Sequence, residues 1–323
     1  MFLVLAFIYI EFIKNIIMSN PLVSVVTVTY NNAKFLQDTI TSVLSQTFRD
    51  FEYIVWDDGS TDNTKEVVDS FDDPRIKYFY EPNQGIGSAT RKACGKTNGQ
   101  YIARLDGDDM WLPDKLQVQV DYMEANKNVV ACGTSEFYID DKNNVVGVLF
   151  HYTNPVTIKK ILSKHSAPIF HSSSIFRKEV YVQIGGYVNI KSCLDTLLWK
   201  RMVHVGTIVN LPVHLACYRL HGSTITVSRS NGPYGKILVP LMDKILNEEG
   251  CNEDDNKLYD SLYALNKELV KKQNIGAQQY NMKSIRLSLP YRVYLLLSKI
   301  LGKQNASNLI FRIKDIYGTY KFK

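Results

Sequence analysis

A doubly wound, mainly parallel sheet flanked by helices is the α/β fold that this chain of 323 residues predicts. Short apolar segments rich in β-branched residues alternate with segments whose apolar residues recur at helical spacing. Such alternation implies right-handed crossovers between parallel strands. Polar clusters end three of the predicted strands, and a helical pattern without strand signals begins near residue 234. The length is sufficient to bury a full α/β core.

The elements alternate strictly along the first part of the chain. Val23 to Thr29 is β-branched almost throughout, which is typical of a strand buried on both faces of a parallel sheet. Residues 137–149 predict a hairpin around 140–144, and residues 150–230 mix short helices and strands. The remaining elements predicted by periodicity are strands over 51–56, 76–80, 101–105 and 129–133 and helices over 35–45, 64–71, 86–97 and 114–125.

The two ends of the chain differ from this main domain, which we place at residues 21–230. Residues 1–20 are an apolar leader whose longest apolar run, the ten residues before Glu11, is too short to span a bilayer. We interpret Met18 as the true start, with a short membrane-associating helix as the alternative. Residues 231–323 predict a helical, basic C-terminal extension.

The net charge of +6 is unevenly distributed. From Lys283 onward there are nine Lys and Arg against one acid, Asp315, around an apolar stretch too short to cross a membrane. This segment either packs on the main domain or lies on an anionic membrane surface. The five cysteines are widely spaced and lack a C-x-x-C motif, which argues against a disulfide framework or zinc cluster. We expect a cytoplasmic protein, peripheral on the inner face of the plasma membrane if the basic segment binds there.

The most specific local feature is the acidic turn Asp106-Gly-Asp-Asp109, which follows an apolar strand. Gly and Asp end strands and favour turns. Carboxylates this close repel one another unless a cation or a donor-rich ligand lies between them. Hard oxygen ligands suit Mg²⁺ or Mn²⁺. The turn therefore predicts a divalent metal site, with a solvated acidic turn as the alternative.

Two other polar clusters share the edge of the sheet with this turn. Tyr30-Asn31 and Asp57-Asp58 each follow a predicted parallel strand. In doubly wound sheets, ligands bind outside the carboxyl ends of the strands. Three polar clusters at one edge therefore predict a ligand site.

Four segments in this order, VSVVTVTYNN, VWDDGSTDNT, EPNQGIG and YIARLDGDD, resemble the inverting family-2 glycosyltransferases with the GT-A fold, of the bacterial surface-polysaccharide type. The resemblance covers roughly residues 21–225. It implies transfer of a sugar from a nucleotide-diphospho-sugar, which we expect to be UDP-linked. The acceptor would be a hydroxyl of a glycan or lipid-linked glycan, and no nucleic acid would take part.

The resemblance also implies the donor-side roles. Asp57 and Asp58 would accept hydrogen bonds from the base and ribose, with Asp58 preferred for the base. Asp106 would contact ribose or metal-bound water, and Asp108 would bind the Mg²⁺ or Mn²⁺ that bridges the two phosphates. Thr29, Tyr30 and Asn31 would form the wall of the base pocket, with a partly buried core aromatic as the alternative for Tyr30, and Gly85 completes the donor-side set.

One motif departs from the family pattern N-x-G-x-x-x-A-R-N. The Asn, Gly and Ala positions are in register, but Thr90 stands where Arg is expected and Arg91 follows it. Either Arg91 reaches a phosphate from the next helical position, or that contact is lost. Arg104 is a candidate substitute, with a surface ion pair as the alternative.

An inverting displacement also needs a general base on the acceptor side. The family places it in a Glu-Asp pair after a Gly-Gly-Tyr turn. Here the turn ends at Tyr187 and Asp195 follows, while Leu194 stands where Glu is usual. Asp195 is the candidate base, with a helix N-cap as the alternative. On the acceptor side, His171 contacts ligand or packs in the core, and Asp109 is either structural or a sugar contact.

Tyr218-Arg-Leu-His-Gly222 resembles the Y-R-x-H element near the end of the family's catalytic domain. The resemblance implies that His221 completes the metal shell or contacts the diphosphate, with Arg219 beside it at the donor. A structural histidine is the alternative.

Other functions remain open on the residues alone. A Rossmann dehydrogenase needs G-x-G-x-x-G directly after the first strand, where this chain has Tyr30-Asn-Asn. A Mg²⁺-dependent phosphotransfer enzyme could use strand-end aspartates, and a non-catalytic nucleotide-sugar-binding module would not need the acidic turn. Release of nucleoside diphosphate from a nucleotide-sugar in the presence of Mn²⁺ separates the glycosyltransferase from all three.

Overall fold

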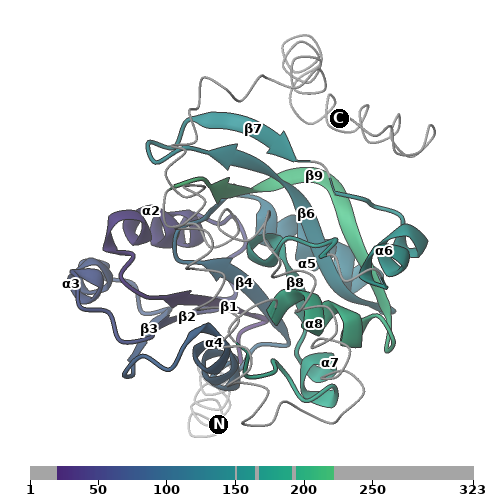
Figure 1. The fold of residues 1–323 in the computed structure, drawn as a ribbon, viewed down its shortest axis with the longest axis horizontal. Helices are drawn as coiled ribbons and strands as arrows, with labels where there is room; N and C mark the ends of the chain where they lie inside the picture. Colours follow the sequence, from purple (N-terminus) through teal and green to yellow (C-terminus); the bar gives the residue numbers. More distant parts are fainter. Residues whose placement is uncertain (1–19, 150, 164–166, 191–193, 222–323) are drawn as a thin grey trace, which may run out of the picture.

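The computed structural model describes residues 20–149, 151–163, 167–190 and 194–221, and within them nine strands form one sheet (Figure 1). Four neighbouring strands are parallel, in the order β3-β2-β1-β4. All seven residues of β1 are buried, as its β-branched sequence predicts for a strand covered on both faces. These strands are β1 (Val23–Thr29), β2 (Phe51–Asp57), β3 (Ile76–Tyr80) and β4 (Tyr101–Asp106).

The other half of the sheet is mixed. β8 (Ile175–Arg177) pairs antiparallel with β4 and with β6 (Val129–Ile139), and β6 runs parallel to β9 (Thr207–Arg219). β5 (Met110–Trp111) pairs antiparallel with β9, and β7 (Val145–Leu149) with β6. The β6–β7 pair confirms the predicted hairpin. The expected mainly parallel, doubly wound sheet is thereby also confirmed, with antiparallel strands inserted beyond β4.

Periodicity did not predict the full length of β6 or the thirteen-residue β9. Both strands contain buried polar residues that interrupt an apolar pattern. Glu136 in β6 pairs with His151 at 2.7 Å, and the amide of Asn210 in β9 donates to the carbonyl oxygen of Pro168 at 2.8 Å. Because loops satisfy these side chains, the strands continue through positions whose polarity argues against burial.

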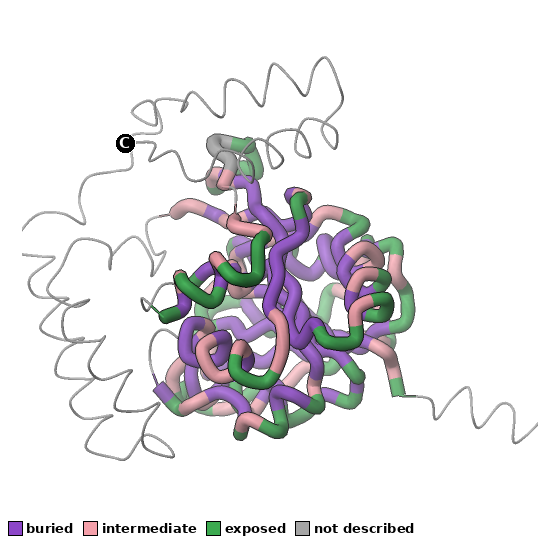
Figure 2. The backbone as a smooth tube through the Cα atoms, turned by 90° about the vertical axis from the view of Figure 1, so that its right-hand side faces the viewer, coloured by how far each residue is buried: buried purple, intermediate pink, exposed green. Residues whose placement is uncertain are grey.

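Helices cover both faces of the sheet and give three layers (Figure 1). Figure 2 shows the buried strands lying inside exposed helical and loop segments. One core contains side chains of α4 (Ile86–Gly95), α6 (Pro155–Leu162), α7 (Lys178–Gln183) and α8 (Leu194–Met202). The other contains side chains of α2 (Ala33–Leu44), α3 (Thr64–Asp69) and α5 (Lys115–Ala125).

The expectations for the two chain ends concern residues that the structure does not describe. They include the leader and the start at Met18, the helical extension over 231–323 and the basic segment from Lys283. Among the residues that are described, no helix is both long enough and apolar enough to cross a bilayer.

Candidate active site

Strand register brings the three polar clusters to one edge of the sheet. Thr29 at the end of β1 pairs with Asp57 at the end of β2, and Val28 pairs with Asp106 at the end of β4. The residues that follow each strand therefore begin at the same height. This confirms the arrangement that the parallel-sheet prediction required.

Tyr30 lies at this edge as an exposed aromatic. Its exposed fraction is 50 %, so the alternative of a partly buried core aromatic is wrong. Asn31 follows it in the left-handed region with φ 52°, which Asn adopts more readily than most residues. The backbone N–H of Asn31 donates to Ser60 Oγ at 2.8 Å, and its Oδ1 accepts from the N–H of Thr61 at 2.8 Å. The loop after β2 therefore holds Tyr30 in place, whereas Thr29 is buried.

The Asp57-Asp58 pair is buried under this edge. The carboxylate of Asp57 accepts from Ser60 N–H at 2.7 Å and from the Tyr78 hydroxyl at 2.7 Å. Asp58 accepts from the N–H of Gln84 at 3.0 Å and of Gly85 at 2.9 Å. Burial raises the pKa of the Asp58 carboxyl, and these two N–H donors oppose the shift. Both aspartates thus fix loops, and each oxygen keeps a second lone pair for a ligand donor.

Asp108 and His221 meet at the same edge although 113 residues separate them. His221 Nε2 lies 2.9 Å from Asp108 Oδ2, and their side chains are 11 % and 22 % exposed. The His221 ring packs on Phe35 of α2, with ring centroids 4.8 Å apart. The described part of the chain holds no group of three or more His, Cys, Asp or Glu that could bind a metal ion.

This pair nevertheless fits a divalent ion of the expected kind. One carboxylate oxygen and one imidazole nitrogen converge, and both side chains are partly exposed. Mg²⁺ is usually bound by one or two carboxylates plus substrate phosphates and water rather than by an all-protein cage, and imidazole suits Mn²⁺ less than it suits zinc but remains a competent ligand. Two protein ligands are therefore what a phosphate-bridging ion would need.

Arg104 lies beneath Asp106 and is fully buried, so it is not a surface ion pair, and its guanidinium is not exposed to a phosphate as a substitute for the expected Arg. Its NH1 donates to the carbonyl oxygen of Val26 at 2.7 Å, and NH2 donates to Asp106 Oδ1 at 2.9 Å. The side chain of Asp106 is 37 % exposed. Arg104 therefore orients the Asp106 carboxylate from inside the protein and leaves one face of it open to a ligand.

Contacts around His171 determine which ring nitrogen carries the proton. Arg104 Nε donates to His171 Nε2 at 3.4 Å, and the Tyr187 hydroxyl lies 2.7 Å from the same nitrogen. Because a guanidinium cannot accept, Nε2 must be the acceptor and Nδ1 carries the proton. His171 Nδ1 then faces Asp106 Oδ1 at 3.7 Å. Burial, followed by the charge of Arg104, lowers the pKa of His171, so the ring is neutral at pH 7.

Asp195 lies near this histidine. It follows Leu194 within α8, so it lies inside the helix and the N-cap alternative is wrong. Its charge acts on both His171 and Tyr187. Arg91 in α4 also lies here, since its NH1 donates to the carbonyl oxygen of Tyr187 at 3.4 Å. Asp106, His171 and Tyr187 are thus in contact in sequence, with Asp195 within electrostatic reach of the last two.

The burial of Asp109 favours a structural role over a sugar contact, because only 1 % of the residue's surface is exposed. Its carboxylate accepts from Ser172 Oγ at 2.5 Å and from the N–H of Arg219 at 2.9 Å, and its carbonyl oxygen accepts from Thr39 Oγ1 at 2.8 Å. Burial, and then the charges of its two acidic neighbours, raise the pKa of Asp109 well above its usual range. Asp109 therefore joins the acidic turn to α2, to the His171 segment and to the end of β9.

Arg219 is also fully buried. Its guanidinium contacts the carbonyl oxygen of Asp108 at 2.7 Å rather than projecting to the surface of the site. The expected contact of Arg219 with the donor is therefore wrong, and its guanidinium binds the backbone of the acidic turn inside the protein.

Sequence reasoning missed three contributors to the site: Ser172, Tyr187 and Asn143. Each lies in a segment that the sequence had singled out for other reasons. Ser172 follows His171, Tyr187 ends the Gly-Gly-Tyr turn, and Asn143 lies in the predicted hairpin. Their partners are 63, 16 and 76 residues away, so no local spacing could have assigned these roles.

A three-layer α/β sheet with an acidic turn at its carboxyl edge is the architecture of the GT-A fold. The family model described as Glycosyl transferase family 2 matches residues 24–185, about half of the chain. The chain therefore belongs to glycosyl transferase family 2, which confirms the resemblance carried by its four motifs.

Curated relatives agree with this assignment. An uncharacterized glycosyltransferase of Haemophilus influenzae is 28 % identical over 86 % of this chain and 87 % of its own length. Chondroitin synthase of Escherichia coli is 28 % identical over 65 % of this chain. The chain spans only 30 % of that synthase, and 25 to 38 % of several other curated relatives.

Solved structures share the fold. TarS 1–349 of S. aureus in complex with UDP-GlcNAc superposes with a TM-score of 0.58 at 16 % identity, covering 93 % of each chain. The mannosyltransferase PcManGT of Pyrobaculum calidifontis, in complex with GDP-Man and Mn²⁺, gives a TM-score of 0.53 at 17 % identity, covering 94 % of this chain and 89 % of its own. At these identities the likeness establishes the GT-A fold alone.

Proposed function

We propose that this family-2 glycosyltransferase transfers a sugar from a UDP-linked donor to a hydroxyl of a glycan or lipid-linked glycan, with inversion and with a divalent ion. The observation that carries the proposal is the Asp108–His221 pair, 2.9 Å apart, beside the half-open carboxylate of Asp106. A phosphotransfer enzyme could share this pair, but membership of the family favours glycosyl transfer.

On the donor side, the exposed ring of Tyr30 gives the nucleotide base a face to stack on, and Asp58 can accept from the base N–H. Asp106, oriented by Arg104, can accept from ribose hydroxyls. Asp108 and His221 would hold the divalent ion. When bound, that ion acts as a Lewis acid that offsets charge on the leaving nucleoside diphosphate.

On the acceptor side, Asp195 would take the proton of the attacking hydroxyl as the new glycosidic bond forms on the face opposite the departing diphosphate. Neutral His171 points its Nδ1–H toward Asp106, and the Tyr187 hydroxyl hydrogen-bonds to His171 Nε2. Asp195 supplies a carboxylate within electrostatic reach of His171 and Tyr187, which supports it as the group that receives the proton.

The ligands of two structural neighbours support the proposed nucleotide-sugar donor and divalent ion. TarS 1–349 was solved in complex with UDP-GlcNAc and with UDP, and PcManGT with GDP-Man and Mn²⁺. A nucleotide-sugar donor and a divalent ion are thus compatible with this fold. The chondroitin synthase relative is in keeping with a polysaccharide product.

A panel of UDP-, GDP- and dTDP-sugars tests the proposed function directly. The full-length protein should release nucleoside diphosphate from a UDP-sugar with Mn²⁺ present, and addition of a glycan acceptor should accelerate release. No release from any nucleotide-sugar, with or without acceptor, would leave a binding module or a phosphotransfer enzyme in its place.

Removing the ring of Tyr30 should weaken donor binding. Because stacking of a base on an aromatic side chain contributes on the order of 1–3 kcal/mol, Tyr30→Ala should raise the Kd for UDP about 5- to 150-fold. Tyr30→Phe keeps the ring and should bind UDP like the wild type. Isothermal titration calorimetry measures both, and equal affinity for all three proteins would remove Tyr30 from the base site.

We also propose that the basic segment from Lys283 holds the enzyme on an anionic membrane surface. Each basic side chain near such a surface contributes on the order of 1 kcal/mol, screened by salt. The full-length protein should sediment with phosphatidylserine vesicles at low salt and be released at high salt. Substituting Gln for Lys299, Lys303, Arg312 and Lys314 should abolish sedimentation while donor hydrolysis persists. Sedimentation that is independent of both changes contradicts an electrostatic contact.

A further inference from the structure

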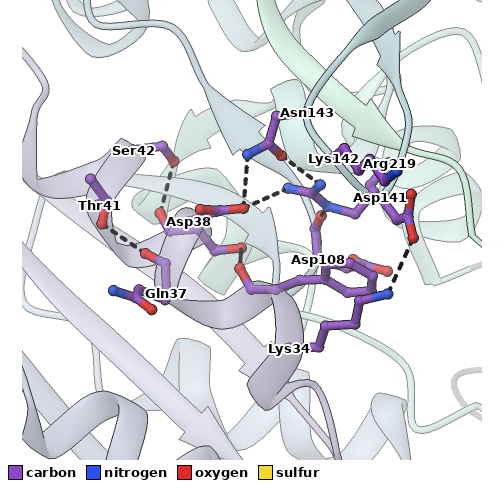
Figure 3. Close-up of polar contacts among 12 residues, drawn as sticks. Lys34, Gln37, Asp38, Thr41, Ser42, Asp108, Asp141, Lys142, Asn143 and Arg219 are labelled. Atoms are coloured by element: carbon purple, nitrogen blue, oxygen red, sulfur yellow. Dashed lines mark hydrogen bonds and ion pairs between the residues drawn. The ribbon is translucent and has the colours of Figure 1, made fainter.

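The guanidinium of Arg219 joins three segments around the acidic turn (Figure 3). Nε donates to the carbonyl oxygen of Asp108 at 2.7 Å. NH1 donates to Oδ1 of Asn143 at 2.6 Å and to the carbonyl oxygen of Asp140 at 3.0 Å, both in the β6–β7 hairpin. NH2 lies 3.4 Å from Oδ2 of Asp38 in α2. One side chain thus links the turn, the hairpin and the helix.

This arrangement constrains Arg219 tightly. The side chain has no exposed surface, and a buried guanidinium is tolerated only where acceptors and opposite charge surround it. Its planar group presents donors in a fixed fork, so the acceptors on three segments must match one geometry. The guanidinium also lies over the ring of Phe35, 4.7 Å from the centroid.

Phe35 connects this network to the second metal ligand. The same ring lies 4.8 Å from the ring of His221. Arg219 therefore holds Asp108 by its carbonyl oxygen. His221, two residues after Arg219, packs on the same Phe35 ring as the Arg219 guanidinium. Both contacts flank the 2.9 Å approach of His221 Nε2 to Asp108 Oδ2.

We propose that Arg219 is a positioning residue that sets the spacing of Asp108 and His221 for the divalent ion, and that Asn143 in the hairpin completes this function from outside the site. The proposal rests on the proposed function, in which these two residues bind the ion. Groups that orient metal ligands are worth about 10- to 100-fold in metal affinity.

Asn143 allows the network to be changed without altering either ligand. It is exposed, its Nδ2 donates to Asp38 Oδ2 at 3.0 Å, and its φ of 67° is left-handed. Glycine adopts this conformation freely, so Asn143→Gly removes the side chain alone. Asp141 in the same hairpin provides a matched control, because it joins α2 through an exposed pair with Lys34 at 3.3 Å.

The test measures Mn²⁺ affinity of the full-length protein from the electron paramagnetic resonance signal of free Mn²⁺, with Mn²⁺ alone and with UDP added. Arg219→Lys keeps the charge but loses the fork, and should raise the Mn²⁺ Kd about 10- to 100-fold. Asn143→Gly should raise it about 3- to 10-fold, the effect of one or two hydrogen bonds. Asp141→Asn should bind Mn²⁺ like the wild type.

Unchanged Mn²⁺ affinity in both Arg219→Lys and Asn143→Gly, with the wild type binding normally, overturns the positioning role and leaves the proposed function intact. An equal loss of Mn²⁺ affinity in Asp141→Asn also overturns the positioning role, because any loosening of the hairpin would then weaken Mn²⁺ binding. A wild type that binds no Mn²⁺ with or without UDP removes the metal site itself, and the positioning role with it. If Arg219→Lys does not fold, the exposed Asn143→Gly variant decides.

Discussion

Replacing Asp108 with Asn should lower turnover by at least about 100-fold, because the amide removes the charge that faces His221 and that, in the proposed function, would hold the divalent ion. The variant keeps the size of the side chain, and an amide can still hydrogen-bond to the imidazole. Folding should therefore be preserved. The measurement is nucleoside-diphosphate release at saturating donor across a range of Mn²⁺ concentrations.

The matched control for this variant is Asp141→Asn, an acid-to-amide change on an exposed side chain of the hairpin. It should retain wild-type turnover. Excess EDTA should reduce the wild type to the level of Asp108→Asn, and Mn²⁺ should restore only the wild type. Full activity of Asp108→Asn, or of the wild type in EDTA, would remove the metal assignment.

Replacing Asp195 with Asn should abolish proton removal from the acceptor while leaving the donor site intact. The amide keeps the shape of the carboxylate but cannot take a proton, so we expect a loss of roughly 10²- to 10⁴-fold in turnover. The affinity for UDP should be nearly unchanged, since the proposed function assigns Asp195 to the acceptor and not to the donor. Turnover assays and calorimetry separate the two effects.

Glu179→Gln gives the corresponding control, because Glu179 is an exposed acid in the first turn of the neighbouring helix α7. Its turnover should match the wild type. If calorimetry shows that Asp195→Asn loses UDP affinity in step with activity, the residue maintains structure and a different group must act as base.

Much of the fold followed from local pattern. β1 and β3 have the predicted bounds, and the strand before the acidic turn gains only Asp106. β1 and β4 are short, apolar and buried almost throughout, so composition alone identifies them, whereas β3 is a partly exposed edge strand that its aromatic and β-branched residues indicate. The long strands β6 and β9 were only partly predicted, because their buried polar residues are satisfied by partners far along the chain.

The sequence by itself determined the family, the parallel half of the sheet and the aspartates at its edge, because these depend on residues within a few positions of one another. Only the tertiary structure decided what each polar side chain does. It buried Arg104 under Asp106, placed Asp109 as a link between segments and directed Arg219 inward. Each of these roles depends on a partner that folding brings from a distant segment and on the cost of leaving a buried polar group without one. That cost is a property of the packed protein, and local sequence does not contain it.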